Sequence, residues 1–116
     1  MAGKARVFTP IPSAARTATG NHDLSGIPGD WDEVVGYLNV TAASGTSPTL
    51  DIKYQTTPDD GTTWFDHTTF TQATTTTTER KVFTVPVGVK GRLLYTIGGT
   101  TPSFTFSLHL ECKRNG

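Results

Sequence analysis

Residues 92–113 read RLLYTIGGTTPSFTFSLHLECK, and their alternation is the clearest structural pattern in the chain. In the second part, apolar side chains occupy every second position: Phe104, Phe106, Leu108, Leu110 and Cys112. Successive strand side chains point to opposite faces, so this spacing gives one face to a core and one to water. Residues 93–97 alternate similarly, and the intervening GGTTP (98–102) is typical of a turn. The stretch therefore predicts a hairpin of an antiparallel sheet that is solvated on one face.

A second copy of this pattern lies earlier in the chain. Residues 45–54, GTSPTLDIKY, match residues 99–108, GTTPSFTFSL, in residue class at most positions, and each segment follows an apolar run. A single hairpin is marginally stable, because its apolar face has nothing to pack against. Two hairpins that face each other solve this for both, which predicts a β-sandwich. The simpler alternative is that Gly-Thr-Ser/Thr-Pro is favourable turn chemistry used twice.

Length and composition favour a single all-β domain. The 116 residues are enough for an ordinary core without a metal or a disulfide. Threonine, which is β-branched and favours extended backbone, makes up about one residue in five. We expect an antiparallel β-sandwich of jelly-roll or Ig-like type, with about seven to eight short strands and no substantial helix. Residues 1–12 are interpreted as an N-terminal arm and an edge strand that contains prolines, and residues 13–116 as the sandwich domain.

Charge, hydropathy and cysteine content argue against several classes of function. The formal net charge is zero, so binding to nucleic acid through phosphate neutralisation is not expected. No long apolar run is present, and the N-terminal charges are not followed by a hydrophobic segment, so no membrane association is expected. A single cysteine excludes an internal disulfide framework and a cysteine-based zinc cluster.

No arrangement of residues typical of catalysis is present in the sequence. His22, His67 and His109 lie in different predicted elements, and their spacing does not require a common zinc site. Asp59 and Asp60 lack the further oxygen ligands that a calcium site needs. No nucleophile elbow is found, and most carboxylates lie in turns or at solvent-facing positions. The sequence predicts no catalytic residue, no metal site, no cofactor and therefore no enzymatic activity.

Residues 57–64, TPDDGTTW, fit the pattern Ser/Thr-x-Asp-x-Gly-x-x-Trp and resemble the Asp-box hairpin of sialidases and other β proteins. In such a turn the Asp side chain accepts backbone N–H groups, the glycine adopts a left-handed conformation and the tryptophan packs over the turn. We expect Thr57, Asp59, Gly61 and Trp64 to form this structural turn. In those families the box carries no catalytic group, and a single copy without an arginine cluster argues against a sialidase.

Large aromatic side chains are the remaining candidates for a surface function. Trp31, Trp64, Phe65 and Phe70 could stack on sugar rings if they are exposed. Alternatively, Trp64 plugs its own turn and Trp31 covers one end of the sandwich, because large aromatic residues are mostly buried.

Three segments, residues 40–51, 57–64 and 95–106, together resemble small β-sandwich proteins encoded among the structural genes of tailed bacteriophages and prophages. The resemblance extends from about Val34 to the C-terminus, and the N-terminal third matches less well. Such proteins include capsid decoration (cement) proteins as well as small tail or head-fibre components. The resemblance implies a non-enzymatic virion protein, made in the host cytoplasm and located on the outer capsid surface.

The same resemblance implies the major capsid protein as partner and a homo-oligomer, a trimer, that matches a local axis of the shell. An N-terminal arm followed by an edge strand can add backbone hydrogen bonds to a neighbouring protein. The candidate partner-binding residues are Lys4, Arg6, Val7, Phe8 and Trp31. The alternative is a tail or head-fibre accessory module that binds host glycan through exposed aromatic residues.

Overall fold

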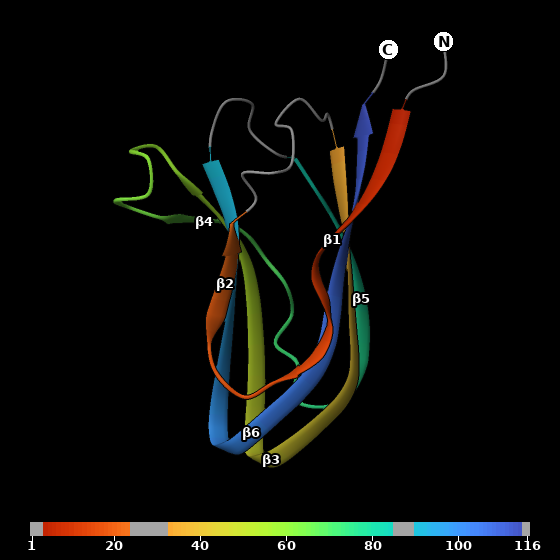
Figure 1. The fold of residues 1–116 in the computed structure, drawn as a ribbon, viewed down its shortest axis with the longest axis vertical. Helices are drawn as coiled ribbons and strands as arrows, with labels where there is room; N and C mark the ends of the chain where they lie inside the picture. The colour runs from red at the N-terminus through yellow and green to blue at the C-terminus, as the bar shows by residue number, and fades with distance from the viewer. Residues whose placement is uncertain (1–3, 24–32, 85–89, 115–116) are drawn as a thin grey trace.

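The computed structural model of the chain describes residues 4–23, 33–84 and 90–114 (Figure 1). These residues form one antiparallel sheet of six strands and contain no helix. The strands are β1 (Lys4–Arg16), β2 (Gly20–Asp23), β3 (Glu33–Thr57), β4 (Phe65–Thr69), β5 (Thr77–Phe83) and β6 (Lys90–Arg114). The predicted all-β, antiparallel class is therefore confirmed.

Two long, bent strands take the place of the two predicted hairpins. Strands β3 and β6 each span 25 residues. They pair with each other along their whole length, from Glu33 opposite Lys113 to Thr57 opposite Lys90. The prediction that the two Gly-Thr-Ser/Thr-Pro segments are hairpin turns is wrong. Each segment bends a strand, and the strand continues into the other half of the sheet (Figure 1).

The two bends are matched, because each glycine makes room for the opposite strand. Gly45 and Gly99 have φ angles of +114° and +110°. A Cβ atom on Gly45 would lie 2.9 Å from the Cα of Pro102, and one on Gly99 would lie 2.9 Å from the Cα of Pro48. The register of the pairing shifts on both sides of Thr46. Both strands thus change direction together while they remain paired, as strands do at the corners of packed sheets.

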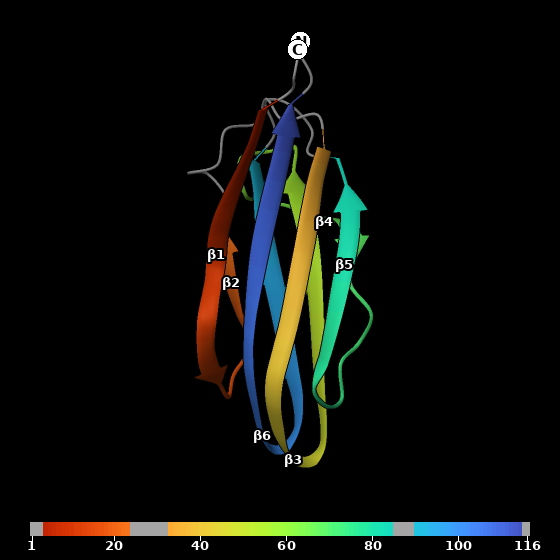
Figure 2. The ribbon, with the colours of Figure 1, turned by 90° about the vertical axis from the view of Figure 1, so that its right-hand side faces the viewer.

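The shorter strands extend each half of this bent sheet. One half has the strand order β1-β6-β3-β5, and the other half has the order β2-β6-β3-β4. The two halves face each other and are joined by the bends of β3 and β6 (Figures 1 and 2). One bent sheet therefore takes the place of the two facing hairpins. The described residues form six strands rather than the expected seven to eight short ones, because β3 and β6 each continue through their bend.

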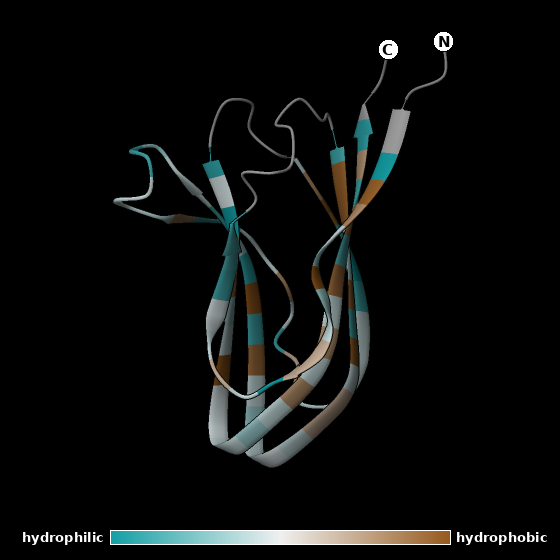
Figure 3. Cartoon of the chain, in the orientation of Figure 1, coloured by the Kyte–Doolittle hydropathy of each residue, from teal (hydrophilic) through white to brown (hydrophobic). Residues whose placement is uncertain are grey.

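The apolar positions of the period-two pattern fill the space between the two halves. One buried cluster contains Phe104, Phe106, Leu108, Leu110 and Cys112 from one half and Leu50, Ile52, Tyr54 and Leu93 from the other. Apolar and polar residues alternate along these strands (Figure 3). The burial predicted from the alternation is confirmed, and a single core holds both halves together.

Candidate functional site

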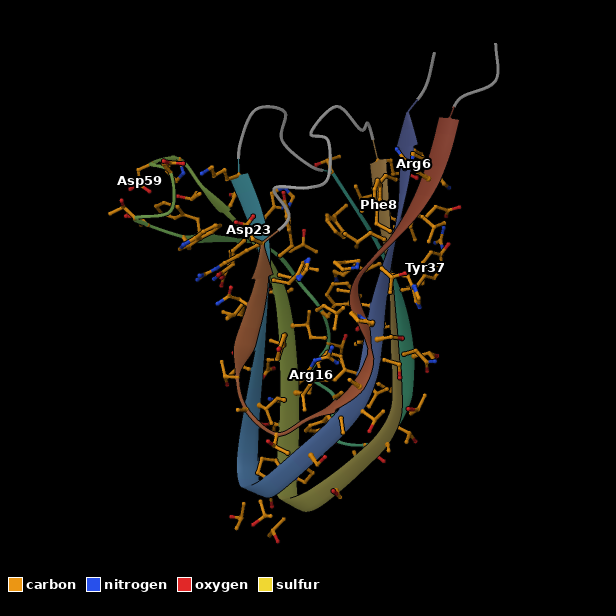
Figure 4. All side chains as sticks on the ribbon, in the orientation of Figure 1. Arg6, Phe8, Arg16, Asp23, Tyr37 and Asp59 are labelled. Atoms are coloured by element: carbon orange, nitrogen blue, oxygen red, sulfur yellow. The ribbon has the colours of Figure 1, made fainter. Side chains whose placement is uncertain are left out.

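Strand β1 carries most of the predicted partner-binding residues and forms an outer edge of the sheet. It runs antiparallel to the C-terminal half of β6, beginning at Lys4. Arg6 and Phe8 share one face, and the Arg6 guanidinium lies 5.2 Å from the centre of the Phe8 ring (Figure 4). Val7 points to the opposite face and is 66% exposed. Trp31 lies outside the described residues.

The sheet edges differ in how well they can accept another strand. In β1, Pro10 and Pro12 cannot donate ladder hydrogen bonds, and the register shifts around them. In β5, Glu79 and Lys81 occupy positions on the core-facing side, as Arg6 does in β1, and such charges discourage pairing with another sheet. Strands β2 and β4 are four and five residues long. Strand β5 pairs with β3 over seven residues without proline, and residues 4–8 of β1 form a regular edge of five residues before the first proline.

The solvent-facing surface beside Val7 is partly apolar. In register, Val7 of β1 lies beside Glu111 of β6, followed by Val35 of β3 and Val82 of β5. Val82 is 47% exposed and Tyr37 is 37% exposed, whereas Val35 is buried. The Tyr37 hydroxyl donates to Oε1 of Glu111 at 3.0 Å. The outer row is the name we give to these residues, which extend from the edge of β1 across the sheet: Val7, Glu111, Val35, Val82 and Tyr37.

Residues 57–64 form a tight turn held by side-chain hydrogen bonds. The Thr57 hydroxyl accepts the N–H of Gly61 at 2.9 Å and donates to Oδ1 of Asp59 at 2.9 Å. The same carboxylate oxygen accepts the N–H of Thr63 at 2.7 Å. Gly61 has a φ angle of +100°, and the half-buried Trp64 ring lies 3.9 Å from where a Gly61 Cβ would stand. The four residues predicted for the structural turn are therefore brought together.

The turn should make stability depend on pH through Asp59. The Thr63 N–H, followed by the Thr57 hydroxyl, lowers the pKa of the Asp59 carboxyl. A lowered folded-state pKa adds stability above the unfolded value of about 3.9, and this is lost as pH falls through the folded value. We expect the stability gap between the wild type and Asp59→Asn to shrink below about pH 4 in thermal melts. A gap that stays constant from neutral pH to about pH 3 would contradict this role.

The neighbouring carboxylates are occupied by groups of the chain itself. Asp60 forms an ion pair with Lys90, and this interaction raises the pKa of Lys90. Asp59 accepts hydrogen bonds within the turn, so both carboxylates considered as calcium ligands have partners in the protein. In the ranges that the structure describes, no group of three or more His, Cys, Asp or Glu side chains is placed to hold a metal ion.

The remaining titratable groups considered for chemistry are scattered. His22 lies in β2, His67 in β4 and His109 in β6. Burial raises the pKa of the Tyr54 hydroxyl to about 12 and that of the Cys112 thiol to about 11. Both groups therefore stay neutral at physiological pH, and both lie in the core. Neither has the ionisation that a nucleophile or a general base needs.

Comparisons with known proteins add no family to this description. No family model matches the chain, and no curated protein matches it. Within the described ranges, no helix is long and apolar enough to cross a membrane. Function is therefore inferred from the residues and their placement.

Proposed function

We propose that the protein is a non-enzymatic capsid decoration protein that binds and stabilises the shell formed by the major capsid protein. The resemblance of residues 40–51, 57–64 and 95–106 to phage structural proteins motivates this assignment. A protein in this role needs a rigid body and a surface that binds its partner, and it needs no reactive groups. The bent sheet with its single core is a body of this kind.

The observation that carries the proposal is the edge of β1 between Lys4 and Phe8. Its outer backbone groups can pair with an extended segment of a partner, and an edge without proline or bulge is suited to such pairing. Val7 is exposed beside this edge, and Val82 and Tyr37 are further exposed hydrophobic side chains of the outer row. Strand addition would give affinity through main-chain hydrogen bonds, and the outer row would bury apolar surface against the shell.

The proposal includes a trimer that sits on a three-fold axis of the shell. Closed cyclic symmetry lets several copies of one edge dock on equivalent subunits at once. Simultaneous docking multiplies weak individual contacts through a high effective concentration. Sedimentation equilibrium measures the oligomeric state of the free protein and of protein that has been bound to shells and then released.

Binding to shells is the direct test of the proposed role. Purified protein is mixed with expanded shells that lack it, and co-sedimentation and the heat resistance of the shells are measured. We expect binding at micromolar concentration and shells that resist higher temperature. Absence of binding at that concentration would refute the role.

A charge placed on the edge tests the docking site. Lysine on an edge strand is a natural device against strand addition, so Val7→Lys should weaken shell binding by at least about ten-fold. Phe65→Lys is the matched control, since Phe65 is an exposed apolar residue on β4 at 56% exposure. Both variants should melt like the wild type, because exposed substitutions cost within about 0.5 kcal/mol. Equal binding by both variants would place the docking site elsewhere.

The alternative, a tail or head-fibre module that binds host glycan, differs in copy number. A decoration protein is present in many copies per particle, in proportion to the capsid subunits. A tail or neck component is present in a handful of copies. Quantitative mass spectrometry of assembled particles distinguishes the two roles.

A further inference from the structure

A polar network lies on the solvent-facing side of the other half of the sheet, away from the outer row. Lys53 Nζ lies 2.9 Å from Oδ2 of Asp66, and the Gln55 side-chain amide donates to Oδ1 of the same carboxylate at 2.8 Å. Arg92 Nε donates to Oε1 of Gln55 at 2.9 Å. The Arg92 guanidinium lies 4.2 Å from the centre of the Trp64 ring. We call these five residues the Arg92 network.

This network fixes the Arg92 guanidinium in one orientation. Its Nε donates to Gln55, its guanidinium lies over the Trp64 ring, and Gln55 itself is only 8% exposed and donates to Asp66. No acceptor in the described part of the chain bonds to the two terminal amino groups of Arg92. Within the described residues these donors have no acceptor, so they can bond to a ligand with little rotamer entropy left to lose on binding.

The Arg92 network is expected to contribute little to the folding stability of the protein. Lys53 and Asp66 are a partly exposed pair, with side chains 37% and 48% accessible, and pairs of this kind contribute little to stability. The hydrogen bond from Gln55, followed by that from Lys53, lowers the pKa of Asp66, so the carboxylate stays ionised as an acceptor. The main physical consequence is a preorganised set of donors and acceptors beside an indole ring.

Charge decides which class of ligand fits. Lys53 and Arg92 are positive, and Asp66 is negative. Asp23 of β2 lies directly opposite Arg92 in the strand register and adds a second negative charge. The surface is therefore close to neutral, which gives a carboxylate or phosphate no net attraction. Neighbouring hydroxyl groups of a sugar, in contrast, both donate and accept hydrogen bonds, and the C–H face of a sugar packs on an aromatic ring.

We infer that the Arg92 network is a binding site for a neutral saccharide. Arg92 and Lys53 donate to sugar oxygens, the free lone pairs of Asp66 accept from sugar hydroxyls, and the exposed part of the Trp64 ring contacts the apolar side of the sugar. The site is separate from the β1 edge, so a decoration protein that carried it would present a glycan-binding surface on the half of the sheet away from the outer row.

The probe is a panel of neutral sugars, namely glucose, galactose, mannose and N-acetylglucosamine, titrated into isotope-labelled protein. The indole N–H signal of Trp64, identified with a Trp31→Phe variant, should shift for at least one sugar, with a dissociation constant on the order of millimolar. Acetate and glucuronate test charged ligands. No shift up to about 50 mM of any neutral sugar, or tighter binding of the charged probes, would overturn the inference.

Variants test the residues of the site. Arg92→Lys keeps the charge but loses the planar fork, and it should weaken sugar binding at least about ten-fold. Arg80→Lys is the matched control, because the Arg80 guanidinium lies 6.0 Å from the Tyr37 ring on the other half of the sheet. Lys53→Gln is a second, more exposed variant that tests the site if Arg92→Lys unfolds. Unchanged sugar binding in a folded Arg92→Lys or Lys53→Gln protein would contradict the assignment, and shell binding should be unchanged in both.

Discussion

Gly45→Ala and Gly99→Ala are each expected to destabilise the protein by about 3 kcal/mol or more, from left-handed strain and overpacking together. Both glycines have positive φ angles, which cost an L-residue about 1–2 kcal/mol. A new Cβ on Gly45 would also lie 2.7 Å from the carbonyl oxygen of Thr101, and one on Gly99 would lie 2.8 Å from that of Ser47. These neighbours are backbone atoms of the paired strand, so they cannot move without opening the bend.

Gly61→Ala is the control for this prediction. Gly61 also has a positive φ angle, +100°, but the nearest atom to its new Cβ is a Trp64 ring atom at 3.9 Å. It should therefore carry only the backbone strain of about 1–2 kcal/mol. Urea unfolding measures all three variants. Equal losses in the three would mean that the paired bends are not closely packed.

Phe106→Ala should cost about 3–5 kcal/mol, the range for truncating a large buried aromatic side chain. Phe106 is fully buried, and its ring lies 5.5 Å from that of Tyr95 in an edge-to-face arrangement. The Arg16 guanidinium lies 4.8 Å from the ring centre and Arg16 also donates to the Phe106 carbonyl oxygen at 3.0 Å. Truncation would remove the ring from the core and leave a cavity between the two halves of the sheet.

Phe65→Ala makes the same change at an exposed position and should cost at most about 0.5 kcal/mol. Phe65 is 56% exposed on β4. Denaturant unfolding at neutral pH compares the two variants directly. A small loss for Phe106→Ala, or similar losses for both, would contradict the burial that follows from the period-two pattern.

The alternation of residues 103–113 predicted the buried apolar side chains, because strand geometry assigns them to one face, but it did not predict that Ser107 on the opposite face is buried as well. The connection between strands was not predictable in this way. Local φ preferences allow a Gly-Thr-Ser/Thr-Pro segment either to reverse or to bend the chain. Which strand the segment pairs with depends on residues more than fifty positions away; Thr46, for example, lies opposite Thr100. Matching of the two segments reflects their direct pairing in one sheet.

The surfaces were predictable only in part. Prolines near the N-terminus correctly marked β1 as an edge, because proline is confined to such positions in sheets. Tyr37 and Val82 were not singled out, although they alternate with the buried Leu38 and Phe83, since their proximity to Val7 follows from the register of four strands. The Arg92 network was not predicted from the sequence either, because its residues come from β3, β4, β6 and the turn and meet only through the pairing of these strands.

Amide hydrogen exchange of the protein alone and bound to shells tests the central proposal most directly. Docking by strand addition should slow amide exchange within residues 4–8 when the protein is bound, because the N–H groups that point outward from this edge become paired with the partner. The bends at Gly45 and Gly99 should exchange alike in both states. Unchanged exchange along β1, with slowing confined to the turn at residues 57–64 or to the bends, would contradict docking through this edge.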